Sequence, residues 1–221
     1  PMSSQRPPSR RATTGTRLAL IRAAETLFAE RGVDAVSLRE VSAAAGQANN
    51  SAVSYHFGSL EGLIDAILER HSNAIQERYA AQLDLLERQG ALSPRAVVEI
   101  LVLPIVRKLD DPDGGWEYIS LASQLSVHPT LPLSLRGVGR TPAVLRMGSV
   151  LWSFALCPPA MLVFRMERVL YTLYGSIVTW HRLAAGGGPT PVSRAMFEQD
   201  LIDSLVSIVV HPTSPVTEPA T

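Results

Sequence analysis

The sequence predicts an all-α protein in which a small N-terminal bundle of three helices precedes a larger helical domain. Apolar residues recur at helical spacing through most of the chain, and no segment shows the strict alternation of a half-buried strand. Pro and Gly separate these segments at helical lengths. With 221 residues, of which 46% are hydrophobic and 18% charged, the chain can bury a sizeable core and is not intrinsically disordered.

The N-terminus is predicted to be a disordered basic arm that leads into the first helix. Residues 1–15 contain Pro, Ser, Thr and Arg with almost nothing to bury. The helix is expected from Thr16 to Arg31, because apolar residues including Leu20 and Phe28 share one face. Gly32 then ends it in a left-handed conformation.

Two short helices joined by a tight turn are expected next. Ser37 and Glu40 have the spacing of a capping box, in which each side chain binds the other residue's backbone N–H. Gly46 can end the first of these helices, and the second runs to Phe57. This order is that of a helix-turn-helix.

The second short helix carries short or planar hydrogen-bonding groups, and no acidic residue occurs from Asn49 to Ser59. Either Asn49 or Asn50 can cap it. Such a surface suits a helix that lies against phosphates and base edges in a DNA major groove. The predicted groove contacts are Asn49, Asn50, Ser51, Ser54, Tyr55 and His56. The predicted backbone contacts are Thr16, Arg17, Ser37 and Arg39.

Charge is unevenly distributed although the formal net charge is zero. Residues 1–60 carry seven arginines against four acidic residues, an excess of three, whereas the rest carry thirteen basic against sixteen acidic side chains. The N-terminal third is therefore typical of a domain with a polyanionic partner. Because the excess is modest, tight binding would need two such domains acting together.

Several sequence blocks resemble the N-terminal DNA-binding domain of the TetR family of bacterial transcription regulators, over about Thr16 to Leu68. The matching blocks are Glu25–Gly32, Ser37–Val41, Ala45–Gly46 and Tyr55–Ser59. The resemblance implies a DNA-binding domain at 16–60 and a helical effector-binding and dimerisation domain at 61–211. It also implies that the fourth helix carries ligand occupancy to the recognition helices.

Two positions depart from the family pattern. Between Gly46 and Phe57 the chain is one residue longer, which puts Ser54 where the family most often has a tyrosine. Leu60 stands where the family usually has a lysine that contacts a phosphate.

The rest of the chain is predicted to be helical. A long helix runs from Ser59 to about Arg88, and Gly90 ends it. Further helices are expected at 93–109, 116–127, 141–155, 160–184 and 190–210, three of which begin with a Ser-Pro or Thr-Pro pair. Pro104 should kink the first of them. Residues 212–221 are Pro- and Thr-rich and are predicted to be a disordered tail.

The last two long helices are apolar on more than one side, which predicts packing within the subunit and pairing with a second copy. Such proteins in the family resembled dimerise through these helices. The alternative is a helix central to a monomer core. The predicted homodimer interface is Val169, Leu173, Ile177, Trp180, Phe197, Leu201, Leu205 and Ile208.

Aromatic and methionine side chains between the long helix and the last two helices favour an apolar cavity with a few polar anchors. This predicts a hydrophobic small-molecule effector, although each residue taken singly is more often plain core. The candidate pocket residues are Trp116, Tyr118, Gln124, His128, Met147, Trp152, Phe154, Met161, Phe164, Arg165, Tyr171 and Tyr174.

Catalysis, cofactors and metals are not predicted. The five histidines are scattered without a ligand repeat, and no Gly-rich phosphate loop or serine elbow is present. Cys157 lies beside two prolines in an apolar run, where an inert thiol is favoured over a nucleophile. A single cysteine agrees with a cytoplasmic protein. The most apolar run, 143–164, is interrupted by Arg146 and two prolines, so no membrane span is expected.

The leading hypothesis is a ligand-responsive repressor that binds a palindromic double-stranded operator as a homodimer and is released by a hydrophobic small molecule. An all-helical enzyme is a weaker alternative. A third hypothesis is a helical interaction or small-molecule-binding module that has lost sequence-specific DNA binding, which Leu60, the longer turn and the zero net charge favour.

Overall fold

The computed structural model describes residues 10–47, 51–186 and 192–214, with side chains from residue 14 onward. Within these residues all regular structure is helical. The α-helices are α1 Arg10–Arg31, α2 Leu38–Ala44, α3 Ala52–Phe57, α4 Leu60–Gln89, α5 Pro94–Arg107, α6 Gly115–Ser126, α7 Pro142–Ser153, α8 Leu162–Ala185 and α9 Arg194–Val210. Short 3-10 helices are η1 Val33–Ala35, η2 Lys108–Asp110, η3 Leu133–Leu135, η4 Gly137–Arg140 and η5 Pro159–Met161.

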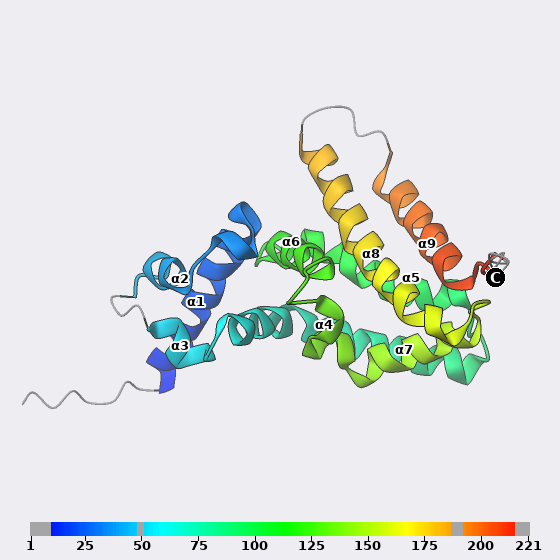
Figure 1. Ribbon diagram of the computed structural model, residues 1–221, viewed down its shortest axis with the longest axis horizontal. Coiled ribbons are helices and arrows are strands. Elements are labelled where there is room, and N and C mark those ends of the chain that lie inside the picture. The colour runs from blue at the N-terminus through cyan, green and yellow to red at the C-terminus, as the bar shows by residue number, and fades with distance from the viewer. Residues whose placement is uncertain (1–9, 48–50, 187–191, 215–221) are drawn as a thin grey trace, which may run out of the picture.

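Helices α1, α2 and α3 form the small domain at one end of the molecule (Figure 1). Its core is built from fully buried side chains that include Leu20 and Phe28 of α1, Val41 of α2 and Val53 of α3. The sequence pattern and the structure agree here, because the residues predicted to share the inner face of α1 are the buried ones. The predicted helix-turn-helix domain is thus confirmed.

Helix α4 joins the small domain to the larger one. Thirty residues at about 1.5 Å rise each make it roughly 45 Å long. Ser59 caps its start by accepting a hydrogen bond from the Gly62 N–H at 3.2 Å. Gly90, with φ 62°, ends it as predicted. A Cβ on Gly62 would lie 2.0 Å from the Phe57 carbonyl oxygen, so only glycine lets α4 start this close to α3.

The larger domain packs α4 to α9 around a second part of the core. Helices α8 and α9 run side by side in opposite directions, and α9 also packs on α5 (Figure 1). Helix α6 lies between α8 and the small domain and makes its most extensive contacts with α8 and α1. The described helices include none long and apolar enough to cross a membrane.

Two predicted boundaries need correction. Helix α1 begins at Arg10, so residues 10–15 are helical instead of belonging to a disordered arm. Helix α9 begins at Arg194, because Ser193 is the residue whose side chain caps it, by accepting from the Met196 N–H. Residues 1–9 of the arm and 215–221 of the tail lie outside the described residues. Pro104 lies inside α5 without ending it.

Candidate nucleic-acid interface and ligand cavity

The turn before α2 is fixed by the predicted capping box. The Glu40 N–H donates to Ser37 Oγ at 3.3 Å, while Ser37 N–H and Oγ donate to the Glu40 carboxylate at 2.9 and 2.8 Å. The Arg31 guanidinium also binds Glu40, at 2.8 Å. The bonds from the Ser37 backbone and hydroxyl, and then Arg31, lower the pKa of Glu40 to about 2. The hydroxyl of Ser37, a predicted phosphate contact, is therefore engaged in the cap.

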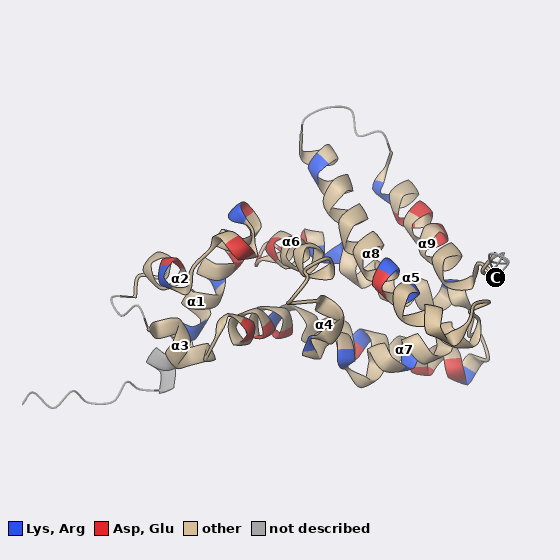
Figure 2. Cartoon of the chain, in the orientation of Figure 1, with Lys and Arg blue, Asp and Glu red and all other residues tan. Residues whose placement is uncertain are grey.

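Helix α3 has a buried side and an exposed side. Ala52 and Val53 are buried, whereas Ser54 and Tyr55 are exposed. The Tyr55 ring is 77% exposed and meets the His56 ring edge-on, with centroids 5.0 Å apart. Figure 2 shows no acidic residue on α3. Of the other predicted groove contacts, Ser51 is exposed, and Asn49 and Asn50 lie outside the described residues.

Basic side chains flank this exposed side from two other elements. The Arg17 guanidinium of α1 lies over the Phe57 ring, 5.0 Å from its centroid, and so ties the start of α1 to the end of α3. Arg39 of α2 is exposed and has no partner among the described residues. Thr16 is half-buried on α1. Leu60 is partly buried against the core and supplies no cation.

A small cavity of about 60 Å³ lies between α4, α5, α6, α8 and the segment from η3 to α7. Its polar groups include the hydroxyls of Tyr79, Tyr118 and Tyr174, and burial raises the pKa of all three, so they remain protonated donors. The full lining is Ile75, Gln76, Tyr79, Leu101, Ile105, Tyr118, Leu133, Val138, Gly139, Val144, Leu170, Leu173 and Tyr174.

The tyrosine hydroxyls of the cavity are not all committed to protein partners. Tyr79 donates to the Leu101 carbonyl at 3.1 Å. The hydroxyls of Tyr118 and Tyr174 are 3.5 Å apart, which is longer than the usual O–H···O distance of about 2.8 Å. Both can therefore bind another polar atom. Among the described residues, no charged side chain lines this cavity, so burial there favours a neutral ligand.

Only two of the predicted pocket residues, Tyr118 and Tyr174, line this cavity. Met147 is buried elsewhere, Trp116 stacks on His181 at 4.4 Å, and Phe154 and Met161 are half-buried. The exposed members of the set are Trp152, Phe164 and Tyr171. Tyr79 and Gln76 also line the cavity but were not predicted, because their place on the inner side of the long helix is equally typical of plain core.

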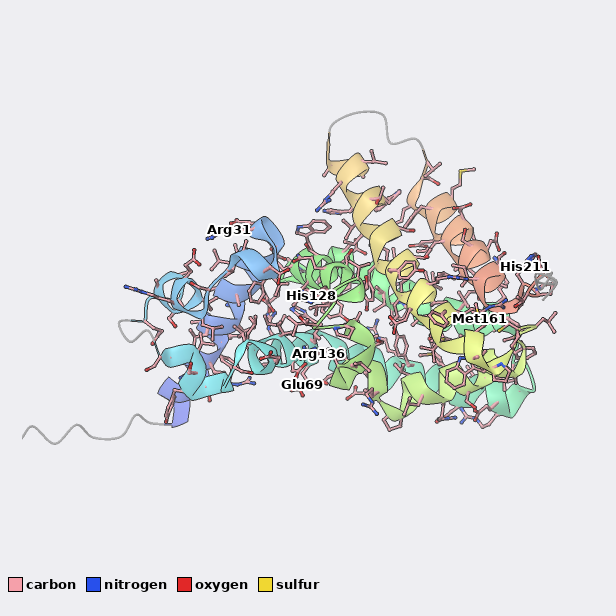
Figure 3. All side chains as sticks on the ribbon, viewed as in Figure 1. Arg31, Glu69, His128, Arg136, Met161 and His211 are labelled. Atoms are coloured by element: carbon pink, nitrogen blue, oxygen red, sulfur yellow. The ribbon has the colours of Figure 1, made fainter. Side chains whose placement is uncertain are left out.

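The three polar anchors predicted for the pocket have other partners. Buried Arg165 donates to the carbonyls of Val209 and His211 at 2.6 and 2.5 Å, where it closes the end of α9. Gln124 and His128 contact the small domain, and Figure 3 shows His128 at the junction between the two domains. These three side chains therefore do not line the cavity described above.

Most of the predicted dimer contacts lie inside the single chain. Val169, Leu173, Ile177, Leu201 and Leu205 are at most 2% exposed, and Phe197 is also buried. They pack α8 and α9 onto the rest of the subunit, so they cannot form its outer face. Trp180 and Ile208 are half-buried. The exposed apolar side chains of the same helices are Val163, Phe164, Tyr171, Leu183 and Met196.

Groups of three or more His, Cys, Asp and Glu side chains that could hold a metal ion are absent from the described part of the chain. Cys157 is half-buried with a free thiol.

Comparison with known proteins follows the same division of the chain. Residues 20–67 match the family described as bacterial regulatory proteins, tetR family. The HTH-type transcriptional repressor KstR2 of Rhodococcus jostii (strain RHA1) is 33% identical over 97 residues, which are 44% of this chain and 45% of that protein. The match thus spans less than half the length of that curated relative.

Solved structures resemble the chain over nearly its whole length. NalD, the secondary repressor of the MexAB-OprM multidrug efflux pump in Pseudomonas aeruginosa, is 19% identical over 91% of this chain and 99% of its own, with a TM-score of 0.55. A TetR-family regulator from Streptomyces coelicolor A3 is 21% identical over 93% of this chain and 99% of its own, with a TM-score of 0.45. The likeness to NalD supports the all-helical fold beyond the small domain.

Proposed function

Because the chain belongs to the TetR family of bacterial transcription regulators, we propose that it is a homodimeric repressor that a small molecule releases from a palindromic operator. The observation that carries the DNA-binding part is the exposed side of α3. Tyr55 leaves 77% of its surface in solvent beside Ser54 and His56, with no acidic residue on the helix. Hydrogen-bonding and apolar groups of this kind read base edges in the major groove.

Phosphate contacts would come from the elements on either side of α3. Arg17 lies over the Phe57 ring, and Arg39 has no acidic partner among the described residues. Arg31, by contrast, is paired with Glu40. Two cations on each subunit give modest affinity, and a dimer doubles the number of phosphate contacts.

Dimerisation is proposed to use a stripe along α8 made of Phe164, Tyr171, Gly175, Thr179 and Leu183. Phe164 and Leu183 are 60% and 55% exposed, and the spacing keeps all five on one side of the helix. Gly175 lets a second helix approach closely. A hollow of about 480 Å³ between α8 and α9, which Tyr171 and Leu183 help to line, would receive side chains of the partner.

The proposed effector is neutral and mostly apolar, with one polar atom that binds the hydroxyls of Tyr118 and Tyr174. The two hydroxyls have hydrogen-bonding capacity left because they are 3.5 Å apart. The apolar lining would hold the rest of the molecule. A volume of about 60 Å³ accepts only a few non-hydrogen atoms, so a larger effector would displace the lining segment that contains Leu133 and Val138.

Selection from random DNA tests the proposed function. The purified protein would be used to enrich duplexes, and the affinity for the enriched duplex would be compared with a scrambled one from roughly 50 to 200 mM salt. We expect an inverted repeat and a preference that survives the higher salt. Failure to enrich any sequence would instead favour an interaction module that has lost DNA binding, which the absence of a cation at Leu60 also favours.

The effector class is tested with pairs of compounds of equal size. Each neutral phenol or alcohol is matched with a carboxylate, and the shift in melting temperature and the release of the selected duplex are measured. We expect neutral members to act and carboxylates to fail, because the described lining of the cavity offers no cation to pair with a carboxylate. A response confined to the carboxylates would overturn this assignment.

A further inference from the structure

One side chain of α6 joins the two domains at the end of α1. The Gln124 Nε2 donates to the Phe28 carbonyl at 3.0 Å, and the Gln124 Oε1 accepts from the Val33 N–H at 2.8 Å. Helix α1 stops between these two groups, since Gly32 has φ 88° and the chain turns into η1. Such N–H and C=O groups at helix ends need partners from outside the helix. The Gln124 amide of the other domain supplies the acceptor for Val33 and a second donor for the Phe28 carbonyl, which also accepts from the Gly32 N–H at 3.0 Å.

The orientation of the Gln124 amide is set by its partners. Phe28 offers a carbonyl, which only accepts, and Val33 offers an N–H, which only donates. Reversing the amide would therefore face donor with donor and acceptor with acceptor. A side chain of the same length without the amide would leave the Val33 N–H without its acceptor, while the Phe28 carbonyl would keep only the bond from the Gly32 N–H at 3.0 Å.

A second contact lies directly after α6. His128 Nδ1 accepts from the backbone N–H groups of Thr130 and Leu131 at 3.2 and 3.0 Å, which puts the ring proton of neutral His128 on Nε2. That nitrogen lies 3.0 Å from Asp34 of η1 and donates to its carboxylate. The end of α6 thus binds the small domain by hydrogen bonds to Phe28, Val33 and Asp34.

The beginning of α6 reaches the ligand cavity. Tyr118 lines the cavity, and its ring lies 5.2 Å from the ring of His71, which in turn binds Glu25 of α1. Helix α1 makes more extensive contacts with α6 than with α4. The twelve-residue helix α6 therefore lines the cavity at its start and binds the small domain at its end.

We infer that Gln124 is a positioning residue, which fixes the angle of the DNA-binding domain relative to the larger domain through its two bonds to the end of α1. This inference rests on the proposed DNA-binding function. On this inference, α6 as well as α4 determines where the recognition helix α3 lies. Helix α4 packs closely against the end of α3 at Gly62. Phe28 and Val33 take part in these bonds through backbone atoms. A substitution of Gln124 is therefore the one that removes the bonds.

The test substitution is Gln124→Met, which keeps the length of the side chain and removes both hydrogen bonds. Gln82→Met is the matched control, because Gln82 is exposed on α4, where it lies beside residues of α5 in the larger domain. Spin labels at Ser54→Cys and Ser149→Cys, in a Cys157→Ser background, report the distance between the domains. We expect Gln124→Met to broaden this distance distribution and Gln82→Met to leave it narrow.

DNA binding provides the second readout. Gln124→Met should bind the duplex selected by the unsubstituted protein about tenfold more weakly and should discriminate less against half-sites moved apart by one base pair. Gln124→Glu should behave similarly, because its carboxylate repels the Phe28 carbonyl. A narrow distance distribution with unchanged affinity would overturn the inference. If the unsubstituted protein selects no duplex, the proposed function fails, and the distance distribution still decides the role of Gln124.

Discussion

The carboxylate of Glu25 and the imidazole of His71 meet at 2.7 Å in a junction that is closed to solvent, where the side chains are 3% and 2% exposed. Arg70 binds the same carboxylate at 2.9 Å and reaches Asp113 at 2.5 Å with its other nitrogen. A single acid of α1 is thus held by two neighbouring residues of α4. Through Glu25, the small domain is therefore held against the larger domain by polar contacts.

Removing that acid should destabilise the protein strongly. Glu25→Ala leaves Arg70 and His71 facing a buried site without their carboxylate, and breaking a buried pair on one side costs about 3–5 kcal/mol. Urea unfolding measures the loss. Glu99→Ala is the control, because Glu99 pairs with Arg95 on the surface and such pairs contribute at most about 1 kcal/mol. Equal losses in the two variants would contradict this reading of the junction.

The capping box should make stability depend on pH in the acid range. The pKa of Glu40 is lowered from 4.5 to about 2 in the folded chain. A depressed pKa stabilises the fold fully above pH 4.5, and this contribution disappears as the pH falls towards 2. Glu40→Gln can keep an acceptor for the cap but cannot titrate. Its melting temperature should therefore lie below that of the parent protein at pH 7 and converge with it near pH 2.

The same titration provides a check on its cause. The two largest causes of the lowered pKa of Glu40 are the hydrogen bonds from the backbone and the side chain of Ser37. In a Ser37→Ala background, the difference in melting temperature between the protein with Glu40 and the Glu40→Gln variant should therefore vary less with pH. An undiminished pH dependence would assign the effect to the backbone N–H of residue 37 and to Arg31, which the substitution leaves in place.

Tyr55 should matter for DNA binding and little for folding. Because 77% of its surface is exposed, Tyr55→Ala should change the free energy of unfolding by no more than about 0.5 kcal/mol. A lost contact to a base is worth about 1–3 kcal/mol, so affinity for the selected duplex should fall roughly tenfold or more. Leu85→Ala, an exposed apolar residue on α4, is the control for both measurements. Unchanged operator affinity would remove Tyr55 from the interface.

Substitutions on the two sides of α8 and α9 should separate pairing from folding. Tyr171→Glu places a charge on the proposed dimer stripe and should give monomers in sedimentation experiments while the helical circular dichroism spectrum is retained. Leu205→Ala removes a fully buried side chain and should lower stability by about 2–5 kcal/mol. A dimer that survives Tyr171→Glu would exclude this stripe.

Local signals in the sequence were sufficient for much of the fold. The Ser37–Glu40 cap, the stop at Gly90 and the buried face of α1 depend on residues a few positions apart, and the structure has all three. The start of α9 was placed too early because Thr190-Pro191 and Ser193 are both plausible caps. Only the structure distinguishes them, since the Ser193 side chain accepts the bond from Met196.

The site was harder to predict because its residues meet across long stretches of chain. Gln124 and Val33 are 91 positions apart, and neither one carries a local sign of the other. On α8 the sequence shows two apolar sides, but residue type alone does not say which side faces inward. Val169, Leu173 and Ile177 therefore looked like contacts for a partner although they fill the core.

The division of α3 into a buried and an exposed side has a consequence for how such proteins diverge. A helix of six residues is too short to be stable alone, so its shape depends on Ala52, Val53 and the contact of Phe57 with Arg17. Ser54 and Tyr55 contribute almost nothing to that support. On the proposed DNA-binding function, substitutions at these outward positions after a gene duplication would change the target sequence in single steps while the fold persists.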